Sequence, residues 1–324
     1  MLKINGVEID AEKFDTNDTR QKAFFNHDYV KANPLIPNSA LATPFKINGT
    51  PAQFACKGLR PRFMYKASAG GKTTHTLWKE GGNSTWYVDI HSIEGGGISS
   101  RTTLGKMQCL LVEMIGAGGG GSGGGATLNG VGGGAGAFAL FVLDLREQSR
   151  FFVEVGAGGA GSSNRGQAGS GEATSLYVGE TADTSNLIIS CGGGGGGDGG
   201  DPGDGGTVTL GPRSDLIVMI YNSTGSNGYA GLSGTHTFEA TTLSCGLEGE
   251  TQCQKTYGPY SVESNEAGAG ANSFFGQGGR PGEGYGDNGA TPLNDGAGGG
   301  GGRMKPLGST TGGNGGRAGI NIYY

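Results

Sequence analysis

The sequence predicts an all-β protein whose strands are joined by glycine-rich connections. Glycine accounts for 72 of the 324 residues, far above the roughly 7% that is usual. Short apolar runs typical of strands stand directly beside the glycine runs. Apolar residues make up only 34% of the chain, which argues against one large aliphatic core. The glycines concentrate in three fields, at residues 115–138, 191–206 and 267–319.

Charge and hydropathy argue against nucleic acid as the main partner and against a membrane span. The net charge is −5 and the charges are scattered, whereas nucleic-acid binding usually needs a basic stripe. No apolar run approaches the roughly 20 residues of a membrane span. The first residues, MLKINGVEID, lack a basic segment followed by an apolar one, so no secretory signal is expected. We therefore expect no nucleic acid as main partner and no membrane span.

Residues 1–50 are predicted to form an N-terminal arm. Residues 3–9 resemble a small β-hairpin with an Asn-Gly turn. Residues 15–31 have helix-capping residues and a modest apolar stripe, and Pro34 and Pro37 end that segment. Two interpretations stay open, a loosely packed arm and an arm that docks on a larger assembly.

Residues 51–105 are predicted to form a small β-rich region. Alternation in residues 85–93 places Trp86, Val88 and Ile90 on one face of a strand. Residues 69–73 partly match a phosphate loop, but Lys66 stands where that motif requires glycine. A nucleotide site is therefore not expected here.

Residues 106–324 are predicted to form a glycine-rich domain in which strand, glycine run and strand repeat. Several of the strands run straight into glycine, so the connections at one end of the β-scaffold are glycine-rich. The strands are expected at residues 107–115, 137–145, 150–155, 175–178, 186–191 and 318–324.

The glycine runs are best explained by polyglycine II helices. Glycine loses the most backbone freedom on folding, so a rigid structure must require it. A threefold left-handed helix of the polyproline II type has no internal hydrogen bonds, and its N–H and C=O groups must find partners in neighbouring helices. Close packing of such helices leaves no room for a Cβ. The glycines predicted to form this interior are Gly119, Gly120, Gly133, Gly194 and Gly195.

A polyglycine helix at the surface of such a bundle can carry a side chain at every third residue. Asn314 and Arg317 have this spacing, and so do Asp198, Asp201 and Asp204. The acidic row also partly matches a calcium-binding repeat, but Gly200 stands where an apolar residue should follow, and the unit does not recur. A solvated acidic face is preferred, and no metal site is predicted.

The remaining chemistry-bearing residues form no recognisable site. Five cysteines at wide spacing do not resemble a disulfide framework. Buried thiols are the preferred interpretation, and a Cys245–Cys253 bridge stays open. His75, His91 and His236 have no partner at metal-ligand spacing, and no Ser-His-Asp or Cys-His order stands out. We expect neither an enzyme nor a cofactor.

The strand-plus-glycine units resemble the glycine-rich domain of bacteriophage tail fibre and tail-tip proteins. The resemblance covers roughly residues 105–324 and rests on residues 110–119, 152–159, 187–194, 273–279 and 320–324. The glycine-rich domain of anaplastic lymphoma kinase is similar in rhythm. The resemblance implies a β-sandwich, jelly-roll-like, packed beside a bundle of polyglycine II helices.

The resemblance also implies a function. Phage adhesins of this type sit at the fibre tip and bind receptors on the host surface through loops that interrupt the glycine runs. Here the corresponding loops are residues 221–264 and 280–311, and the candidate contact residues are Tyr229, Tyr257, Tyr260 and Tyr285, since tyrosine offers rigid contact area.

The expected partners are a host receptor and, through the N-terminal arm, other tail proteins of the virion. A homotrimer is compatible with the sequence, although no heptads demand it. Two alternatives stay open, a purely structural virion part and a secreted adhesin, which the missing signal disfavours.

Overall fold

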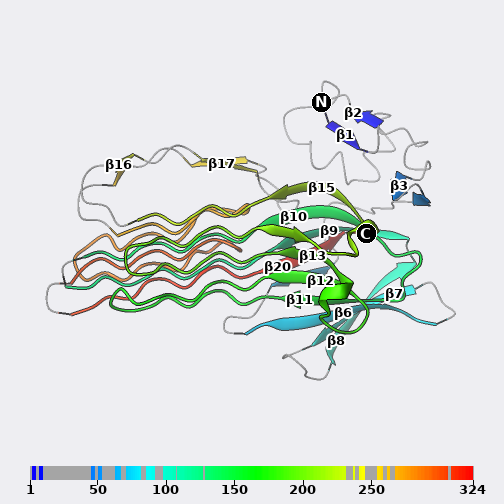
Figure 1. Ribbon diagram of the computed structural model, residues 1–324, viewed down its shortest axis with the longest axis horizontal. Helices are drawn as coiled ribbons and strands as arrows, with labels where there is room; N and C mark the ends of the chain where they lie inside the picture. Colours follow the sequence, from blue (N-terminus) through cyan, green and yellow to red (C-terminus); the bar gives the residue numbers. More distant parts are fainter. Residues whose placement is uncertain are drawn as a thin grey trace.

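The computed structural model shows a chain built almost wholly from β-strands and extended segments (Figure 1). It describes residues 2–4, 7–9, 45–47, 50–52, 63–66, 71–81, 85–91, 98–106, 108–126, 128–230, 236–237, 241–244, 254–257, 261–262, 267–305 and 308–323. The helices in these residues are short 3-10 turns, η2 (Thr184–Asn186) and η3 (Ser214–Leu216). None of the described helices has both the length and the apolar character to cross a lipid bilayer.

Two antiparallel sheets form the body of the protein. The five-stranded sheet has the order β15 (Ile217–Ser223), β10 (Phe138–Asp144), β9 (Cys109–Ile115), β20 (Gly319–Tyr323) and β5 (Phe63–Lys66). The seven-stranded sheet has the order β14 (Val208–Leu210), β13 (Leu187–Cys191), β12 (Thr174–Val178), β11 (Arg150–Val155), β6 (Thr73–Lys79), β7 (Thr85–His91) and β8 (Ile98–Lys106).

The two sheets share one apolar core, in agreement with the predicted β-sandwich. Strand β9 supplies Leu110, Val112 and Met114 from one sheet, and β7 supplies Trp86 and Val88 from the other. These side chains are almost fully buried, and they alternate along their strands because successive side chains point to opposite faces. The predicted inward face is thereby confirmed for residues 85–91, and residues 92 and 93 lie outside the described residues.

The chain connections differ from the jelly-roll part of the prediction. Strands β6 to β8 are neighbours in one sheet, and so are β11 to β14. Consecutive strands therefore mostly stay together, whereas jelly rolls are built from Greek keys. The strands of the predicted small β-rich region also pair within these sheets, since β5 pairs with β20 and β6 pairs with β11.

Among the described residues, four two-stranded pairs lie outside the main sheets. They are β1 (Leu2–Ile4) with β2 (Val7–Ile9), β3 (Phe45–Ile47) with β4 (Thr50–Ala52), β16 (His236–Thr237) with β19 (Ser261–Val262), and β17 (Thr241–Ser244) with β18 (Gln254–Tyr257). The pairing of Ile4 with Val7 confirms the predicted N-terminal hairpin. The predicted helical segment at residues 15–31 and the Cys245–Cys253 pair lie outside the described residues.

The five-stranded sheet is buried on its second face as well. Leu111 and Tyr323 are fully buried there. The Glu113 carboxylate is also buried, and it accepts hydrogen bonds from Asn321 Nδ2 at 2.9 Å and from the Tyr323 hydroxyl at 2.8 Å. These donors satisfy a carboxylate that would otherwise be costly to bury.

Two cysteines in the described residues are buried free thiols, as the sequence predicts. Cys109 is the first residue of β9 and Cys191 is the last residue of β13. Burial, with a smaller contribution from Asp144, raises the pKa of the Cys109 thiol to about 12. A thiol with so high a pKa is a poor nucleophile at neutral pH.

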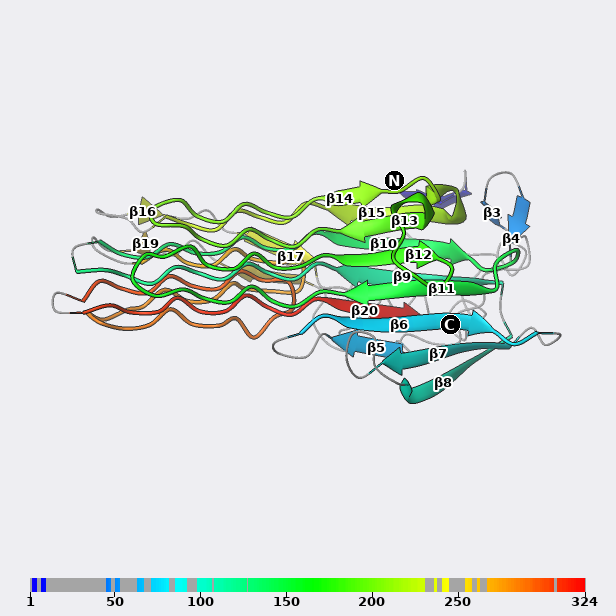
Figure 2. The same cartoon turned by 60° about the horizontal axis from the view of Figure 1, so that its bottom comes forward.

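The glycine-rich segments extend from one end of the two sheets as a long bundle (Figures 1 and 2). The segments that follow β9, β11 and β13 run outward from the sheets, turn and run back (Figures 1 and 2). We call this part the glycine bundle and its end farthest from the sheets the distal end. The glycine bundle comprises residues 116–126, 128–137, 156–173, 192–207, 224–230, 267–305 and 308–318.

Candidate functional site

The backbone hydrogen bonds of the glycine bundle change partner with a period of three residues. Within residues 117–122, the N–H groups of Gly118 and Gly121 donate to Gly316 and Gly313. The residues between them donate to two other segments, again with a period of three residues. Ala117 and Gly120 donate to Glu172 and Gly169, and Gly119 and Ser122 donate to Gly134 and Val131. Each neighbour is thus met again after three residues.

The carbonyl groups of the same segment follow the same rule. Those of residues 117–122 accept from Gly194 and Gly197, from Gly159 and Ser162, and from Gly299 and Gly302. Every N–H and C=O of residues 117–122 is therefore paired with a neighbouring segment. Three segments accept from it (131–134, 169–172 and 313–316) and three donate to it (159–162, 194–197 and 299–302).

Four of the five predicted interior glycines lie where the segments approach too closely to admit a Cβ, and the fifth, Gly195, is less tightly packed. A Cβ added to Gly119 would lie 1.9 Å from the carbonyl oxygen of Gly195, and one added to Gly133 would lie 2.2 Å from that of Gly119. Added Cβ atoms at Gly120 and Gly194 would meet backbone oxygens at 2.2 and 2.1 Å. At Gly195 the nearest atom is a backbone nitrogen at 2.9 Å. The neighbours are backbone atoms, which cannot rotate away.

Side chains occur at the surface of the bundle, and they replace missing backbone partners. Thr311, Asn314 and Arg317 are exposed, while Gly313 and Gly316 between them are buried, which confirms the predicted spacing of Asn314 and Arg317. The Asn314 Oδ1 accepts from the Gly161 N–H at 2.8 Å. Asparagine oxygens thus complete the hydrogen bonding where no further segment is present.

The acidic row is exposed to solvent as predicted, but its three aspartates do not lie on one extended segment. Asp198 and Asp201 belong to a turn, in which the Asp198 carbonyl accepts from the N–H groups of Gly200 and Asp201. Gly199 there has a φ of +57°, which favours glycine. Only Asp204 lies on the returning segment. No group of three or more His, Cys, Asp or Glu side chains in the described part of the chain is placed to hold a metal ion.

Several turns come together at the distal end, and their side chains form the candidate site. Tyr285 is 62% exposed and Leu128 is 53% exposed. The Arg303 guanidinium lies over the Tyr285 ring, 4.8 Å from its centroid. Hydrogen bonds tie the turns together, since Met304 accepts from the Gly286 N–H at 3.0 Å and donates to Asn129 Oδ1 at 2.9 Å. The surface is polar, aromatic and built on fixed backbone.

The four predicted contact tyrosines are in different situations. Tyr285 lies at the distal end, as described above. Tyr229 is half-buried in a bundle segment, where its carbonyl accepts from the Gly132 N–H at 2.9 Å. Tyr257 lies in strand β18, and Tyr260 lies outside the described residues.

The predicted receptor loops contain more regular structure than expected. Residues 217–223 form strand β15, and residues 224–230 belong to the glycine bundle. Residues 280–305 and 308–311 likewise belong to bundle segments and short turns rather than to open loops. The reason is that exposed side chains at every third residue give a surface segment the composition of a loop.

Thr310 holds the distal turns from inside the bundle. Its side chain is 2% exposed. Its hydroxyl accepts from the Gly124 N–H at 2.7 Å and donates to the Arg303 carbonyl at 2.8 Å. One buried hydroxyl thus joins segments far apart in the sequence.

Replacing Thr310 by valine should destabilise the protein by about 1–3 kcal/mol, because it leaves a buried N–H and C=O unsatisfied. Thr310→Ser, which keeps the hydroxyl, should lose less. Urea unfolding of both variants measures the difference. Equal stability of the valine variant and the wild type would show that this hydroxyl does not hold the turns.

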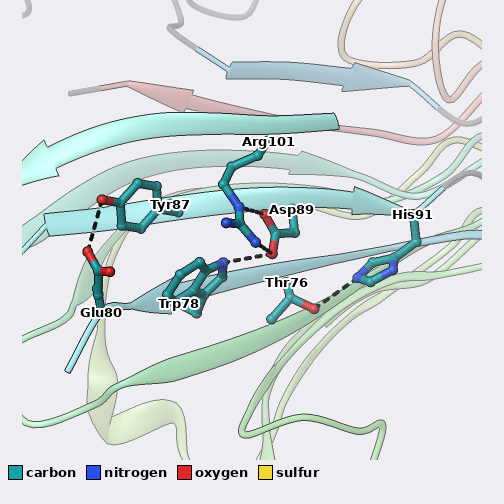
Figure 3. A network of polar contacts seen from close by, with 7 residues as sticks. All are labelled: Thr76, Trp78, Glu80, Tyr87, Asp89, His91 and Arg101. Carbon is teal, nitrogen blue, oxygen red and sulfur yellow. Dashed lines mark hydrogen bonds and ion pairs between the residues drawn. The ribbon is translucent and has the colours of Figure 1, made fainter. Parts of the chain in front are cut away.

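A second polar cluster, which the sequence did not reveal, lies on the outer face of β6, β7 and β8 (Figure 3). The buried Asp89 carboxylate accepts from Arg101 Nε at 2.6 Å and from Trp78 Nε1 at 2.8 Å. The Trp78 and Tyr87 rings stack at 4.8 Å, and the Arg101 guanidinium lies over Trp78. Cross-strand register brings these residues together, since Trp78 pairs with Tyr87 and Asp89 with Arg101. The polar groups of this second cluster are mainly used in bonds to one another. We therefore place the candidate site at the distal end.

Comparison with known proteins gives a family. A family model described as a glycine-rich domain matches residues 97–324. The match takes in strand β8, most of both sheets and the whole glycine bundle. A comparison with curated proteins found no match.

Proposed function

Since the chain belongs to the glycine-rich domain family, we propose that it is a bacteriophage tail fibre or tail-tip component. In this proposal the glycine bundle holds the distal turns still, and those turns bind a receptor on the host surface. The protein is then part of the virion tail after synthesis in the host cytoplasm. The proposal assigns it no catalytic role and no cofactor.

The segments of the glycine bundle are proposed to be polyglycine II helices. This form has three residues per turn, which matches the return to each neighbour after three residues. The six neighbours of residues 117–122 also fit helices packed side by side in a hexagonal array. Such an array is rigid because nearly every backbone group is committed to a neighbour.

One observation carries the functional proposal, which is the collection of turns at the end of a rigid bundle. Binding residues tend to lie on loops that a rigid scaffold positions. Here the turns that carry Leu128, Tyr285 and Lys305 are joined by hydrogen bonds, since Lys305 donates to the Gly125 carbonyl and Gly286 donates to the Met304 carbonyl. The bundle turns gather at the end opposite the sheets (Figures 1 and 2). The sheets and residues 1–50 are then left to attach the protein to other tail proteins, with a homotrimer as one form of assembly.

The distal residues should be needed for host adsorption and not for folding. The triple variant Leu128→Ser, Tyr285→Ser and Lys305→Ser should reduce adsorption of assembled particles by about tenfold or more, because exposed aromatic and basic anchors carry most binding energy. A matched control replaces Leu210 and Lys106, which are exposed on the sheets. Unchanged adsorption by particles carrying the distal variant would contradict the proposal and favour a purely structural virion role.

A further inference from the structure

One corner of the distal end combines an exposed aromatic ring with two basic side chains. The turn at residues 284–287 carries Tyr285, and residues 303–305 lie beside it. Arg303 covers one face of the Tyr285 ring at 4.8 Å from its centroid. Because the residue is still 62% exposed, the opposite face of the ring is turned toward solvent.

The second basic residue, Lys305, is fixed against the same turn. A Cβ added to Gly286 would lie 3.5 Å from Lys305 Cδ, and one added to Gly308 would lie 3.2 Å from it. The aliphatic part of Lys305 therefore packs beside both glycines, and the residue as a whole is exposed to solvent. Lysine commonly packs its stem in this way while its charge stays in water.

The nearby acidic groups leave these cations available. The Asp287 carboxylate is engaged in its own turn, where it accepts from the Gly284 N–H at 2.6 Å. The Arg303 guanidinium donates from Nη1 to the main-chain carbonyl of Glu283. Its Nε is buried, so an anion would meet the outer nitrogens of the group. Glu283 is the remaining exposed carboxylate of this corner. No ion pair joins a carboxylate to Arg303 or Lys305 in the part of the chain that the structure describes.

We propose that this corner binds an acidic saccharide. The apolar face of a sugar ring packs on the free face of Tyr285, and the acidic group of the sugar pairs with Arg303 and Lys305. Arginine suits this role because its planar group offers several donors to one anion while stacking on an aromatic ring. The inference rests on the proposed function, since it names the chemistry that the distal turns meet on a host surface.

The backbone of the turn favours a saccharide over an acidic peptide. Peptides that bind in an extended form by strand addition are held through main-chain hydrogen bonds. Here the N–H groups of Gly284, Gly286 and Asp287 are already used, for Asp287 Oδ2, Met304 and Gly284 respectively. Recognition must then come from side chains, which suits a ring that carries a charged group.

Binding of the full-length protein to defined polymers tests this inference. The probes are alginate, whose sugar rings carry carboxylates, neutral dextran, and polyglutamate, which has carboxylates without sugar rings. The protein should bind alginate, and Tyr285→Ala, Arg303→Gln and Lys305→Gln should each weaken that binding about tenfold. Arg317→Gln, the same charge change on an exposed side of the bundle, serves as the control. Thermal unfolding checks that each variant is folded.

Each outcome decides the matter. Absence of alginate binding, equal binding of polyglutamate, equal binding of dextran, or an equal loss with Arg317→Gln would overturn the inference. The proposed function is judged separately, by particle adsorption. If the distal triple variant loses adsorption while the wild type does not bind alginate, the proposed function stands and the saccharide inference fails. Alginate binding without any adsorption defect would instead contradict the function.

Discussion

Alanine at Gly119 or Gly133 is expected to prevent stable folding. The added Cβ would lie 1.9 Å and 2.2 Å from backbone oxygens, far inside the 3.4–4 Å of ordinary van der Waals contact. Overpacking a core costs about 1–3 kcal/mol when side chains can give way. Here only backbone can move, and moving one segment breaks hydrogen bonds to its other neighbours. Each substitution should therefore remove more than about 3 kcal/mol, out of the roughly 5–15 kcal/mol that stabilise a typical domain.

Soluble yield and urea unfolding of Gly119→Ala and Gly133→Ala measure this effect. The matched control is Gly71→Ala, because a Cβ at Gly71 meets nothing within 4 Å. The control should fold like the wild type. Bundle variants as stable as the control would mean that the segments are not packed as described, and that the glycine runs act as flexible connections.

Acidification is expected to destabilise the protein through His75. This side chain is fully buried on β6, and burial, with a smaller contribution from His91, lowers its pKa from 6.5 to about 3. Below pH 6.5 the unfolded chain binds a proton that the folded chain does not. Stability therefore falls as the pH falls, by up to about 1.4 kcal/mol per pH unit, and by up to ~5 kcal/mol in all before the folded imidazole is protonated near pH 3.

Unfolding midpoints between pH 7 and pH 4 measure this dependence. Protonation of carboxylates also lowers the stability of the folded protein in acid. The comparison is therefore between the wild type and His75→Phe, whose side chain cannot take up a proton. The phenylalanine variant should show a shallower decline with falling pH. His91→Gln, on the outer face beside Thr76 (Figure 3), should keep most of the decline. If the unfolding midpoints of the wild type and His75→Phe fall in parallel with pH, His75 does not cause the expected part of the decline.

The strands and their connections could be predicted from the sequence because the two kinds of segment differ so sharply. Apolar runs such as residues 109–115 and 138–144 form paired strands, and the glycine runs beside them form the bundle. The exclusion of Cβ atoms from Gly119 and Gly133 also follows from elementary geometry, since hydrogen-bonded segments without side chains approach closely. Composition alone therefore indicated both parts of the fold.

The rest depends on where each segment turns, which composition does not specify. Aspartates three residues apart fit both a surface segment and a tight turn, and Asp198 and Asp201 proved to be in a turn. The pairing of Tyr285 with Arg303, and of Trp78 with Tyr87, depends on contacts across segments. Such contacts come from the packing of the bundle and the register of the sheet, which one sequence does not reveal.

Amide hydrogen exchange along residues 117–122 and 130–137 tests the central claim most directly, which is that the glycine bundle is a rigid hydrogen-bonded structure. Every N–H of residues 117–122 is bonded to a neighbouring segment. These amides should exchange about a thousandfold or more slowly than in an unstructured chain, at rates similar to those of β9 and β10. Exchange as fast as in an unstructured glycine-rich chain would contradict the account.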